Sequence, residues 1–434
     1  MGRDLTGSTL APARIVHLAP HVGGGVGTAL AALVREDKAH RHDLVCLEAP
    51  TRTGAVDAFT AAGGAVHIAP QAATLAAALA SADAVQIELW NHPALIAALR
   101  SLPPLPLRLL LWCHTAGTSW PCFPLPLLRL AQRVVFTSSV SLRADGIDPR
   151  RCAVVSSAAP VDHLPLPVPR AANALPRLGC VGTLSKAKLH PDFVPLLAAA
   201  LPAGQSVAMI GDPTEAPALL AECAALGRPD LLHFEGWCSD MPRRLRQLDV
   251  LLHLLQPSHY GTGENALVEA MAMGVVPLVW RNAAELALLR GAGHVADSAV
   301  VDDLASLRVA LEPLLNDGEH RARLSAAVCQ HARAQFRTGR LSAQMSEVYR
   351  AALAQPKRTL TLAAALGTCP ADAFRLFLPA AHGYRDDGTV ALPRDRAEAA
   401  LMRSPTKGSA LHFARVFPDD FLLAAWARAL SAAA

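Results

Sequence analysis

Short apolar runs alternate with longer alanine-rich stretches along most of the chain. In the first part, the apolar runs expected to form strands are 13–19, 43–48, 65–69, 83–89, 107–113 and 133–137. The stretches with helical spacing between them are 26–39, 55–62, 72–82, 93–101 and 124–132. Alternation of strand and helix indicates a parallel sheet with helices on both faces.

A second series of the same kind follows a proline-rich segment at 164–176, which is typical of a linker between domains. Its expected strands are 177–182, 206–211, 231–235, 249–255 and 275–280, and helical patterns at 320–336 and 339–355 come after them. The sequence therefore predicts an α/β protein with two Rossmann-like domains, 1–165 and 177–338.

The last part of the chain, 357–434, does not continue the alternation. Apolar periodic pieces occur at 359–366, 371–380, 396–402 and 420–433, around a middle that is rich in turn-forming residues. This pattern predicts a small helical extension, and nothing in it names a role.

Composition narrows the class of protein. The chain has 434 residues, too many for one ordinary core, and its net charge of +4 argues against wholesale nucleic-acid binding. Nine scattered cysteines, an odd count without a Cys-x-x-Cys pair, indicate neither a disulfide framework nor a zinc ribbon and favour the reducing cytoplasm.

Membrane insertion is not expected, since no uninterrupted apolar run reaches about 18 residues, the length that spans a bilayer. The N-terminus also lacks an apolar core of signal-peptide length. Arginines at 133, 143, 150 and 151 leave a peripheral contact with an anionic membrane open, although a solvated face is the simpler explanation.

The most informative segment is 260–282, Tyr-Gly-Thr-Gly-Glu-Asn-Ala-Leu-Val-Glu-Ala-Met-Ala-Met-Gly followed by an apolar strand. A glycine-containing turn opens a helix, and Glu269 lies on its second turn. The bare N–H groups and the positive dipole end of such a helix can receive a diphosphate. A carboxylate one turn further on can accept hydrogen bonds from ribose hydroxyls.

This segment resembles the donor-binding helix of retaining GT-B glycosyltransferases, in particular the glycogen-synthase-like group (glycosyltransferase family four, group 1). The resemblance implies two facing Rossmann-like domains, with residues 339–356 crossing back to the first. It also implies hexosyl transfer with retention from a nucleoside-diphosphate sugar. That sugar would be bound on the second domain, with no metal and no further cofactor.

Within the segment, the resemblance places the donor against Thr262, Gly263, Asn265, Ala266 and Glu269. We expect Thr262 or Gly263 to cap the helix, with Glu264 in its first turn. The family has a further acidic residue eight positions before Glu269, where this chain has glycine. Glu264, three residues later, is the candidate to replace it as a catalytic group, although it also has the simpler explanation of a charge that complements the helix dipole.

The start of the second series carries a second departure from the family pattern. The family has an arginine just after Gly182 and a lysine about five residues on, and here these positions are Thr183 and Lys188. The resemblance makes Lys188 a catalytic group that neutralises the leaving diphosphate. Lys186 is a second donor-binding candidate, without the bidentate geometry of arginine. Trp237 either stacks on the nucleotide base or packs between domains.

Candidates in the first domain follow the ends of its strands, where ligands bind in doubly wound sheets. His114 follows strand 107–113, and the resemblance places it against the transferred sugar as a catalytic group. Gly24 and Gly25 lie in a loop whose backbone can approach a ligand closely, although such a turn can also serve packing alone. The resemblance places this loop against the donor phosphate or the acceptor. Asn91 and His92 either recognise an acceptor hydroxyl or cap the next helix.

Three functions stay open at this stage. The favoured one is a cytoplasmic glycosyltransferase with an unknown acceptor: a glycan, a lipid carrier, a protein or a small molecule. The second is a non-catalytic glycosyltransferase-like partner, motivated by Thr183 and by glycine at 261 where the family has arginine and glutamate. A sugar-nucleotide epimerase is less favoured, because no additional acid/base carboxylates can be placed.

Overall fold

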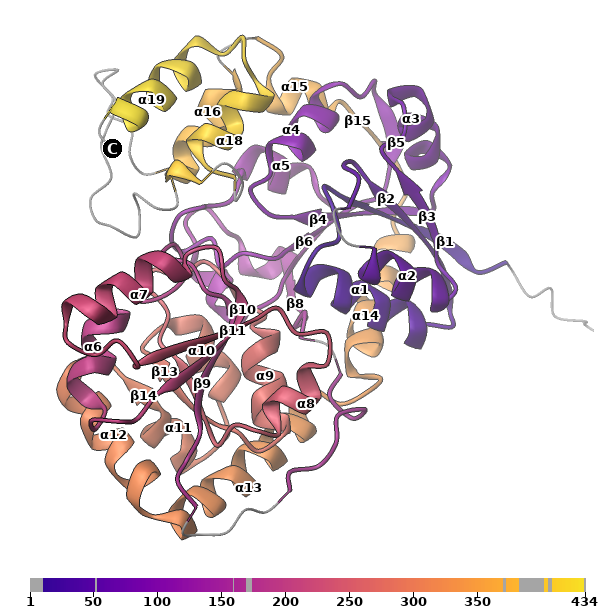
Figure 1. Cartoon of the computed structure of the whole chain (residues 1–434). Helices are drawn as coiled ribbons and strands as arrows, with labels where there is room; N and C mark the ends of the chain where they lie inside the picture. The colour runs from indigo at the N-terminus through magenta and orange to yellow at the C-terminus, as the bar shows by residue number, and fades with distance from the viewer. Residues whose placement is uncertain are drawn as a thin grey trace, which may run out of the picture.

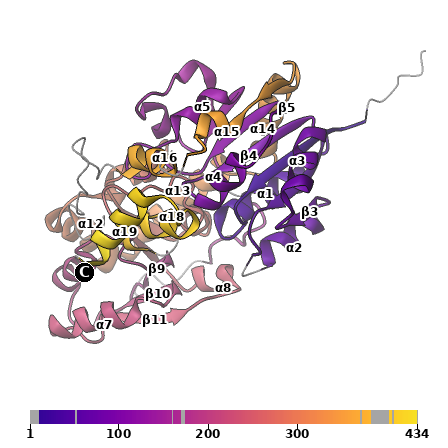
Figure 2. The ribbon, with the colours of Figure 1, turned by 90° about the horizontal axis from the view of Figure 1, so that it is seen from above.

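The computed structural model describes residues 11–50, 53–158, 160–168, 174–369, 372–381, 402–404 and 408–432. It consists of two α/β domains with a smaller helical extension against the first (Figure 1). Figure 2 shows the same arrangement from above. The fold class expected from the sequence is confirmed. No helix among the described residues is long and apolar enough to cross a membrane.

The first domain is built on a seven-stranded parallel sheet of order β3-β2-β1-β4-β6-β7-β8. Its strands are β1 (Ala13–Ala19), β2 (His40–Cys46), β3 (Ala65–Ile68), β4 (Ala84–Leu89), β6 (Leu109–Cys113), β7 (Arg133–Phe136) and β8 (Cys152–Val154). Its helices are α1 (Gly25–Glu36), α2 (Gly54–Ala61), α3 (Ala72–Ser81), α4 (Pro93–Arg100) and α5 (Leu125–Leu130). The edge strand β8 was not anticipated, because it is only a few residues long.

The second domain repeats the plan with a six-stranded parallel sheet of order β11-β10-β9-β12-β13-β14. Its strands are β9 (Leu178–Thr183), β10 (Val207–Asp212), β11 (Leu232–Gly236), β12 (Val250–His253), β13 (Val276–Trp280) and β14 (Val300–Val301). Its helices are α6 (Phe193–Ala200), α7 (Ala216–Ala225), α8 (Met241–Leu245), α9 (Asn265–Ala272), α10 (Ala283–Leu289), α11 (His294–Ala299), α12 (Leu304–Asn316) and α13 (Gly318–Gln335).

Strand order reverses beside β1 in the first sheet and beside β9 in the second. At such a switch point the helices leave toward opposite faces, so the carboxyl ends of the central strands are open to ligands. The position of each functional side chain follows from this rule.

Helix α14 (Arg340–Leu353) follows the second domain in sequence but packs on the first (Figure 1). Its buried Leu341, Met345 and Tyr349 share a core with α1 and one face of the first sheet. Helices α3, α4 and α5 cover the opposite face of that sheet. The first sheet is therefore buried on both faces, as the near-continuous apolar strands predict.

The extension begins with β15 (Arg358–Leu360), which pairs antiparallel with β5 (Leu105–Leu107) of the first domain. Its helices are α15 (Leu362–Leu366), α16 (Asp372–Ala381), α18 (Ala410–Val416) and α19 (Phe421–Ala432). The helix predicted over 359–366 thus opens as a strand, because a free edge of β5 is within reach. The helix predicted at 396–402 lies, apart from Met402, outside the described residues.

Candidate active site

The loops at the carboxyl ends of the two sheets meet at the junction between the domains. The Ala116 N–H donates to the Tyr260 carbonyl at 2.7 Å, and the hydroxyls of Thr137 and Thr262 contact each other. A Cβ added to Gly25 would lie 3.0 Å from the Asn265 side chain. The glycine loop before α1 and the start of α9 therefore face each other across the junction.

Helix α9 begins at Asn265, and Glu264 is its N-cap residue, with no hydrogen bond from its side chain to the first turn. The predicted cap at Thr262 or Gly263 was therefore one or two residues too early. The reason is that Glu264 has a non-helical backbone and its carboxylate is held elsewhere. Asn265, Ala266 and Glu269 remain partly exposed, so side chains do not seal this end of the helix.

Lys188 and Glu264 form the closest ion pair at this end of α9. The Lys188 ammonium donates to Glu264 Oε2 at 2.7 Å, and both side chains are largely buried. Burial opposes both charges, but the contact raises the pKa of Lys188 and, with nearby histidines, holds the pKa of Glu264 well below its usual range. Both groups are ionised at neutral pH.

Gly261, which stands where the resembling family has an acidic residue, has a steric explanation. A Cβ at this position would lie 2.3 Å from Glu264 Oε1 and 2.5 Å from the His259 ring. The Glu264 carboxylate thus occupies the space in which a side chain at 261 would begin. An acidic group is present beside Gly261, although the sequence supplies it from three residues further on.

Three more ionisable side chains complete what we call the lysine cluster: Lys188, Glu264, His253, His259 and Glu285. His259 lies between the two carboxylates, with Nδ1 at 3.2 Å from Glu285 Oε1 and Nε2 at 3.7 Å from Glu264 Oε1. His253 Nε2 lies 3.8 Å from Glu264 Oε2, and burial lowers the pKa of His253 to about 4. The His253 ring is therefore neutral at neutral pH.

His259, Glu264 and Glu285 come close enough together to share a cation. The Lys188 ammonium, however, already lies 2.7 Å from Glu264 and would repel a metal ion bound there. Lys188 is the cation that the structure places beside these carboxylates.

Glu269 lies half-buried on the second turn of α9. Burial raises the pKa of its carboxyl to about 7, and among the described residues no hydrogen bond or ion pair to it is found. A carboxylate that is partly desolvated and has no protein partner is poised to accept hydrogen bonds from a ligand.

Three other donor candidates have different surroundings. Lys186 lines a small hollow beside α6 and α7 with Phe193 and Glu222, and its backbone N–H donates to Glu215 at 2.7 Å. Lys188 is not among the residues that line this hollow. Thr183 ends β9, half-buried, and Trp237, just after β11, is 63% exposed.

Gly263 and Thr262 are used in packing between the domains. A Cβ on Gly263 would lie 2.2 Å from Ser157 Oγ of the first domain, and Thr262 is 1% exposed. Gly24 has φ +68° and open space around it, so its requirement for glycine is conformational. Thr262 and Gly263 shape the turn before α9, and Gly24 shapes the loop before α1. Contacts of their backbone with a donor stay a prediction.

In the first domain, His114 follows β6 and is fixed by a carboxylate that we did not single out from the sequence. Its Nε2 lies 2.8 Å from Glu88 Oε2, and Glu88 is fully buried on β4. Sequence carried a signal for this residue, because Gln86 and Glu88 interrupt an apolar strand and a buried polar group requires partners. His259 and Glu285 lacked such a signal, since they lie in loops and helix starts.

Asn91 and His92 both contact the extension, and His92 also caps α4. The Asn91 amide donates to the Gly408 carbonyl of the extension at 2.8 Å. His92 caps α4 by accepting from the Ala94 N–H, and its ring packs edge-on against His412 with centroids 4.7 Å apart. The capping alternative is observed, and the extension reaches this end of the junction.

The extension also touches the second domain. An apolar cluster around Phe374, Phe413 and Trp426 includes Trp120 from the first domain, and Tyr260 of the second packs against it. Tyr260 lies in the turn before α9, so the extension helps to hold the turn on which Glu264 is carried.

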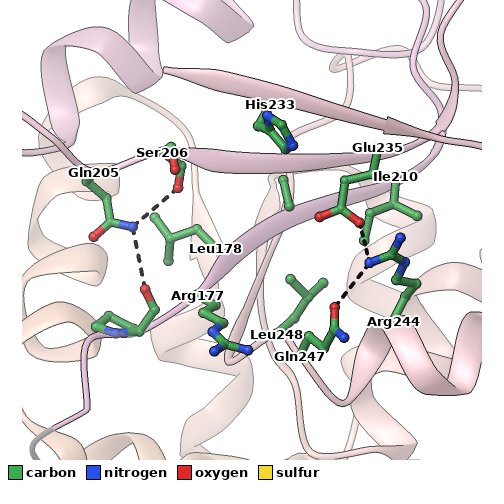
Figure 3. A pocket seen from close by; sticks show the side chains of 12 residues that line it. Arg177, Leu178, Gln205, Ser206, Ile210, His233, Glu235, Arg244, Gln247 and Leu248 are labelled. Carbon is green, nitrogen blue, oxygen red and sulfur yellow. Dashed lines mark hydrogen bonds and ion pairs between the residues drawn. The ribbon is translucent and has the colours of Figure 1, made fainter. Parts of the chain in front are cut away.

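A separate hollow of about 320 Å³ opens on the face of the second sheet under β9, β10 and β11 (Figure 3). On one side of it Arg244 pairs with Glu235 at 3.0 Å, and Leu178, Ile210 and His233 are among the strand residues that line it. None of the residues that line it belongs to the lysine cluster or lies on α9.

Comparison with known proteins supports the interpretation of the second domain. Residues 175–317 match the protein family described as "Glycosyl transferases group 1". The matched segment contains β9 and α9, and with them Lys188, Glu264 and Glu269. No curated protein matches the chain.

Solved structures match both domains. A glycosyltransferase from Rickettsia africae superposes with a TM-score of 0.59 at 13% identity, covering 79% of this chain and 99% of its own. Anabaena HepE in complex with UDP and glucose gives 0.58 at 15% identity, covering 78% and 99%. An O-GlcNAc transferase from Thermobaculum terrenum gives 0.58 at 20% identity, covering 79% and 67%.

The chain has the GT-B fold. About a fifth of the chain has no counterpart in the Rickettsia structure, although nearly all of that protein is covered.

Proposed function

We propose that the protein is a glycosyltransferase that moves a hexosyl group from a nucleoside-diphosphate sugar to an acceptor hydroxyl, with retention and without a metal ion. The observation that carries the proposal is the group at the start of α9: Lys188 and Glu264 beside the first turn, and Glu269 one turn further on without a partner. The matched glycosyl transferase domain and the GT-B fold support it.

The diphosphate would bind at the start of α9, between Lys188 and the glycine loop at Gly25. An ammonium has three N–H donors, and only one of them is engaged by Glu264, so Lys188 can donate to phosphate oxygens without leaving its partner. Negative charge grows on the diphosphate as the glycosidic bond breaks. Lysine and the helix dipole then stabilise the transition state more than the bound donor.

The two glutamates would have different tasks. Glu264 is held ionised, so it is an acceptor for hydroxyls of the transferred sugar and a counter-charge for an oxocarbenium-like centre. Glu269, with its raised pKa of about 7 and no partner, would accept the ribose hydroxyls. His114 would contact the transferred sugar from the first domain.

The donor is tested by measuring binding and turnover of UDP-, GDP- and dTDP-sugars. UDP-sugars come first, because a solved neighbour, Anabaena HepE, is in complex with UDP. Lys188→Ala and Glu269→Ala should each lower turnover by about 100-fold or more. Lys38→Ala, an exposed lysine of the first domain, is the matched control. Normal turnover in both site variants would refute the site.

The finer parts of the proposal have their own measurements. NMR of the product from an α-linked donor should show an α-linkage, and turnover should persist in the presence of a chelator. A wild-type chain that binds nucleotide sugars but transfers and hydrolyses none would instead be a binding partner. We propose a cytoplasmic location, and the acceptor is to be sought among glycans, lipid carriers, proteins and small molecules.

A further inference from the structure

A line of polar side chains crosses the otherwise apolar face of the first sheet that α1 and α14 cover. We call it the buried polar chain. Its members are His114 (after β6), Glu88 (β4), His17 (β1), His42 (β2) and Asp37 (at the end of α1). The strands β2, β1, β4 and β6 are neighbours in the sheet, so each member reaches the next across one strand spacing.

Every step of the chain is a close contact. His114 Nε2 lies 2.8 Å from Glu88 Oε2, and His17 Nδ1 lies 3.0 Å from Glu88 Oε1. His17 Nε2 and His42 Nδ1 are 2.9 Å apart, and His42 Nε2 lies 3.3 Å from Asp37 Oδ2. Glu88 and His17 have no exposed surface.

Both carboxylate oxygens of Glu88 accept hydrogen bonds. Its Oε1 also accepts from the Gln86 amide at 2.7 Å, and Gln86 in turn accepts from the Tyr349 hydroxyl of α14 at 2.7 Å. Burial alone would raise the pKa of Glu88, but the bonds from His114 and His17 hold it below the usual value. Glu88 is therefore a carboxylate, and the nitrogens that face it carry protons.

The hydrogen bonds to Glu88 show how a buried carboxylate is kept charged. His17 Nδ1 donates to Glu88 and His17 Nε2 accepts from His42 Nδ1, so two neutral imidazoles supply both protons. Burial lowers the pKa of His42, which favours its neutral form. The donors from His114, His17 and Gln86 replace the water that a buried carboxylate loses.

We propose that Glu88 is a positioning residue that holds His114 in the tautomer protonated on Nε2. The other ring nitrogen, Nδ1, is then left as a hydrogen-bond acceptor for a hydroxyl of the transferred sugar, and the hydrogen bonds from His17 and Gln86 keep Glu88 ionised. This inference rests on the proposed function for the sugar contact. The tautomer itself depends only on the contacts of the buried polar chain.

The tautomer is measured directly by two-dimensional ¹H–¹⁵N NMR of the imidazole rings, on the full chain labelled with ¹⁵N-histidine. The His114 signals are assigned by their loss in His114→Asn. At pH 7.5 the wild-type ring should give the pattern of a single Nε2–H tautomer. A ring protonated on Nδ1, or an even mixture of the two tautomers, would overturn the proposal without any assay of activity.

A variant then separates positioning from folding. Glu88→Gln can present either an acceptor or a donor to His114, so the ring should lose its single tautomer. The kcat should fall by about 100-fold, with the KM for the donor within about twofold of wild type. Asp43→Asn is the matched control, since Asp43 is a buried carboxylate of the same sheet that pairs with Arg14.

The outcomes distinguish this inference from the proposed function. An Nε2–H ring in a wild-type chain without transferase activity would uphold the positioning by Glu88 and refute the function. Normal kcat and an unchanged tautomer in a folded Glu88→Gln protein would refute the positioning alone. If Glu88→Gln does not fold, the wild-type ring pattern still decides the tautomer.

Discussion

The buried polar chain of the first domain and the lysine cluster of the second both hold ionised groups out of water, but they differ in how completely those groups are paired. In the buried polar chain, contacts of 2.8–3.3 Å join one member to the next, and Glu88 has three donors. In the lysine cluster, two contacts of His253 and His259 with Glu264 are as long as 3.7–3.8 Å.

The lysine cluster is also incompletely satisfied. Among the described residues, neither nitrogen of His253 nor Oε2 of Glu285 has a hydrogen-bond partner. A buried polar atom without a partner costs free energy that a ligand can recover when it binds. In the buried polar chain His42 Nε2 is also without a hydrogen-bond partner among the described residues, but it lies near the end of that chain that is far from His114. Glu88 is fully hydrogen-bonded, whereas the lysine cluster keeps these three unpartnered atoms beside the proposed donor site.

The largest effect is expected from breaking the Lys188–Glu264 pair. Lys188→Met leaves a mostly buried carboxylate with only long contacts, so the free energy of unfolding should fall by about 3 kcal/mol, and Glu264→Gln in the same chain should restore part of it. Urea titrations of the two single variants and the double variant measure this coupling. Lys38→Met serves as the exposed control.

This prediction has a pH signature. The pKa of Glu264 is lowered in the folded protein, so its stabilising contribution is present above the ordinary carboxyl pKa and is lost as the pH falls below it. The difference between wild type and Lys188→Met should therefore shrink in acid. Single variants within about 0.5 kcal/mol of wild type at pH 7 would place the pair among weak surface ion pairs.

The next effect concerns Glu269, whose pKa of about 7 lies within the working pH range. Ribose hydroxyls favour the ionised carboxylate, so nucleotide affinity should be flat above pH 7 and weaken below it, by about tenfold from pH 7.5 to 6. Calorimetric titrations with the nucleotide follow the change. Glu269→Gln should bind weakly with no such slope, and an identical slope in that variant would assign the titration to another group.

A smaller effect is expected where the two domains approach each other. A methyl group on Gly25 would lie 3.0 Å from the Asn265 amide and push it from the start of α9, so Gly25→Ala should weaken nucleotide binding about fivefold. Gly54→Ala, at the start of α2 with open space around it, is the matched control. Equal affinities for the two variants would show that the glycine loop does not constrain the donor site.

The smallest effect should come from Tyr349, which supports the buried polar chain through Gln86. Tyr349→Phe removes the hydroxyl that donates to Gln86, and the free energy of unfolding should fall by about 1 kcal/mol. Nucleotide affinity should not change, because Glu88 keeps its three donors. Thermal unfolding with and without nucleotide tests both parts, and a large loss of affinity would mean that α14 acts on the donor site.

Much of the fold was predictable from local patterns. Apolar runs separated by alanine-rich helices indicate a parallel sheet wherever they occur, and strand ends are where ligands bind. This reasoning placed His114 at the end of β6 and Glu269 on α9. It was less accurate where a residue has two local options, as at the start of α9, because the side chain of Glu264 reaches Lys188 instead of capping the helix.

The sequence alone determined the two α/β domains, the glycine turn before α9 and the residue types that a nucleotide-sugar site requires, since each depends on neighbours a few positions away. Only the tertiary structure decided that Glu264 pairs with Lys188 and that Lys186 lines a hollow with Leu219 and Glu222. It also decided that Glu88 holds His114 and that the extension reaches Tyr260. These facts depend on distances between residues that are far apart in the chain, and local spacing carries no information about such distances.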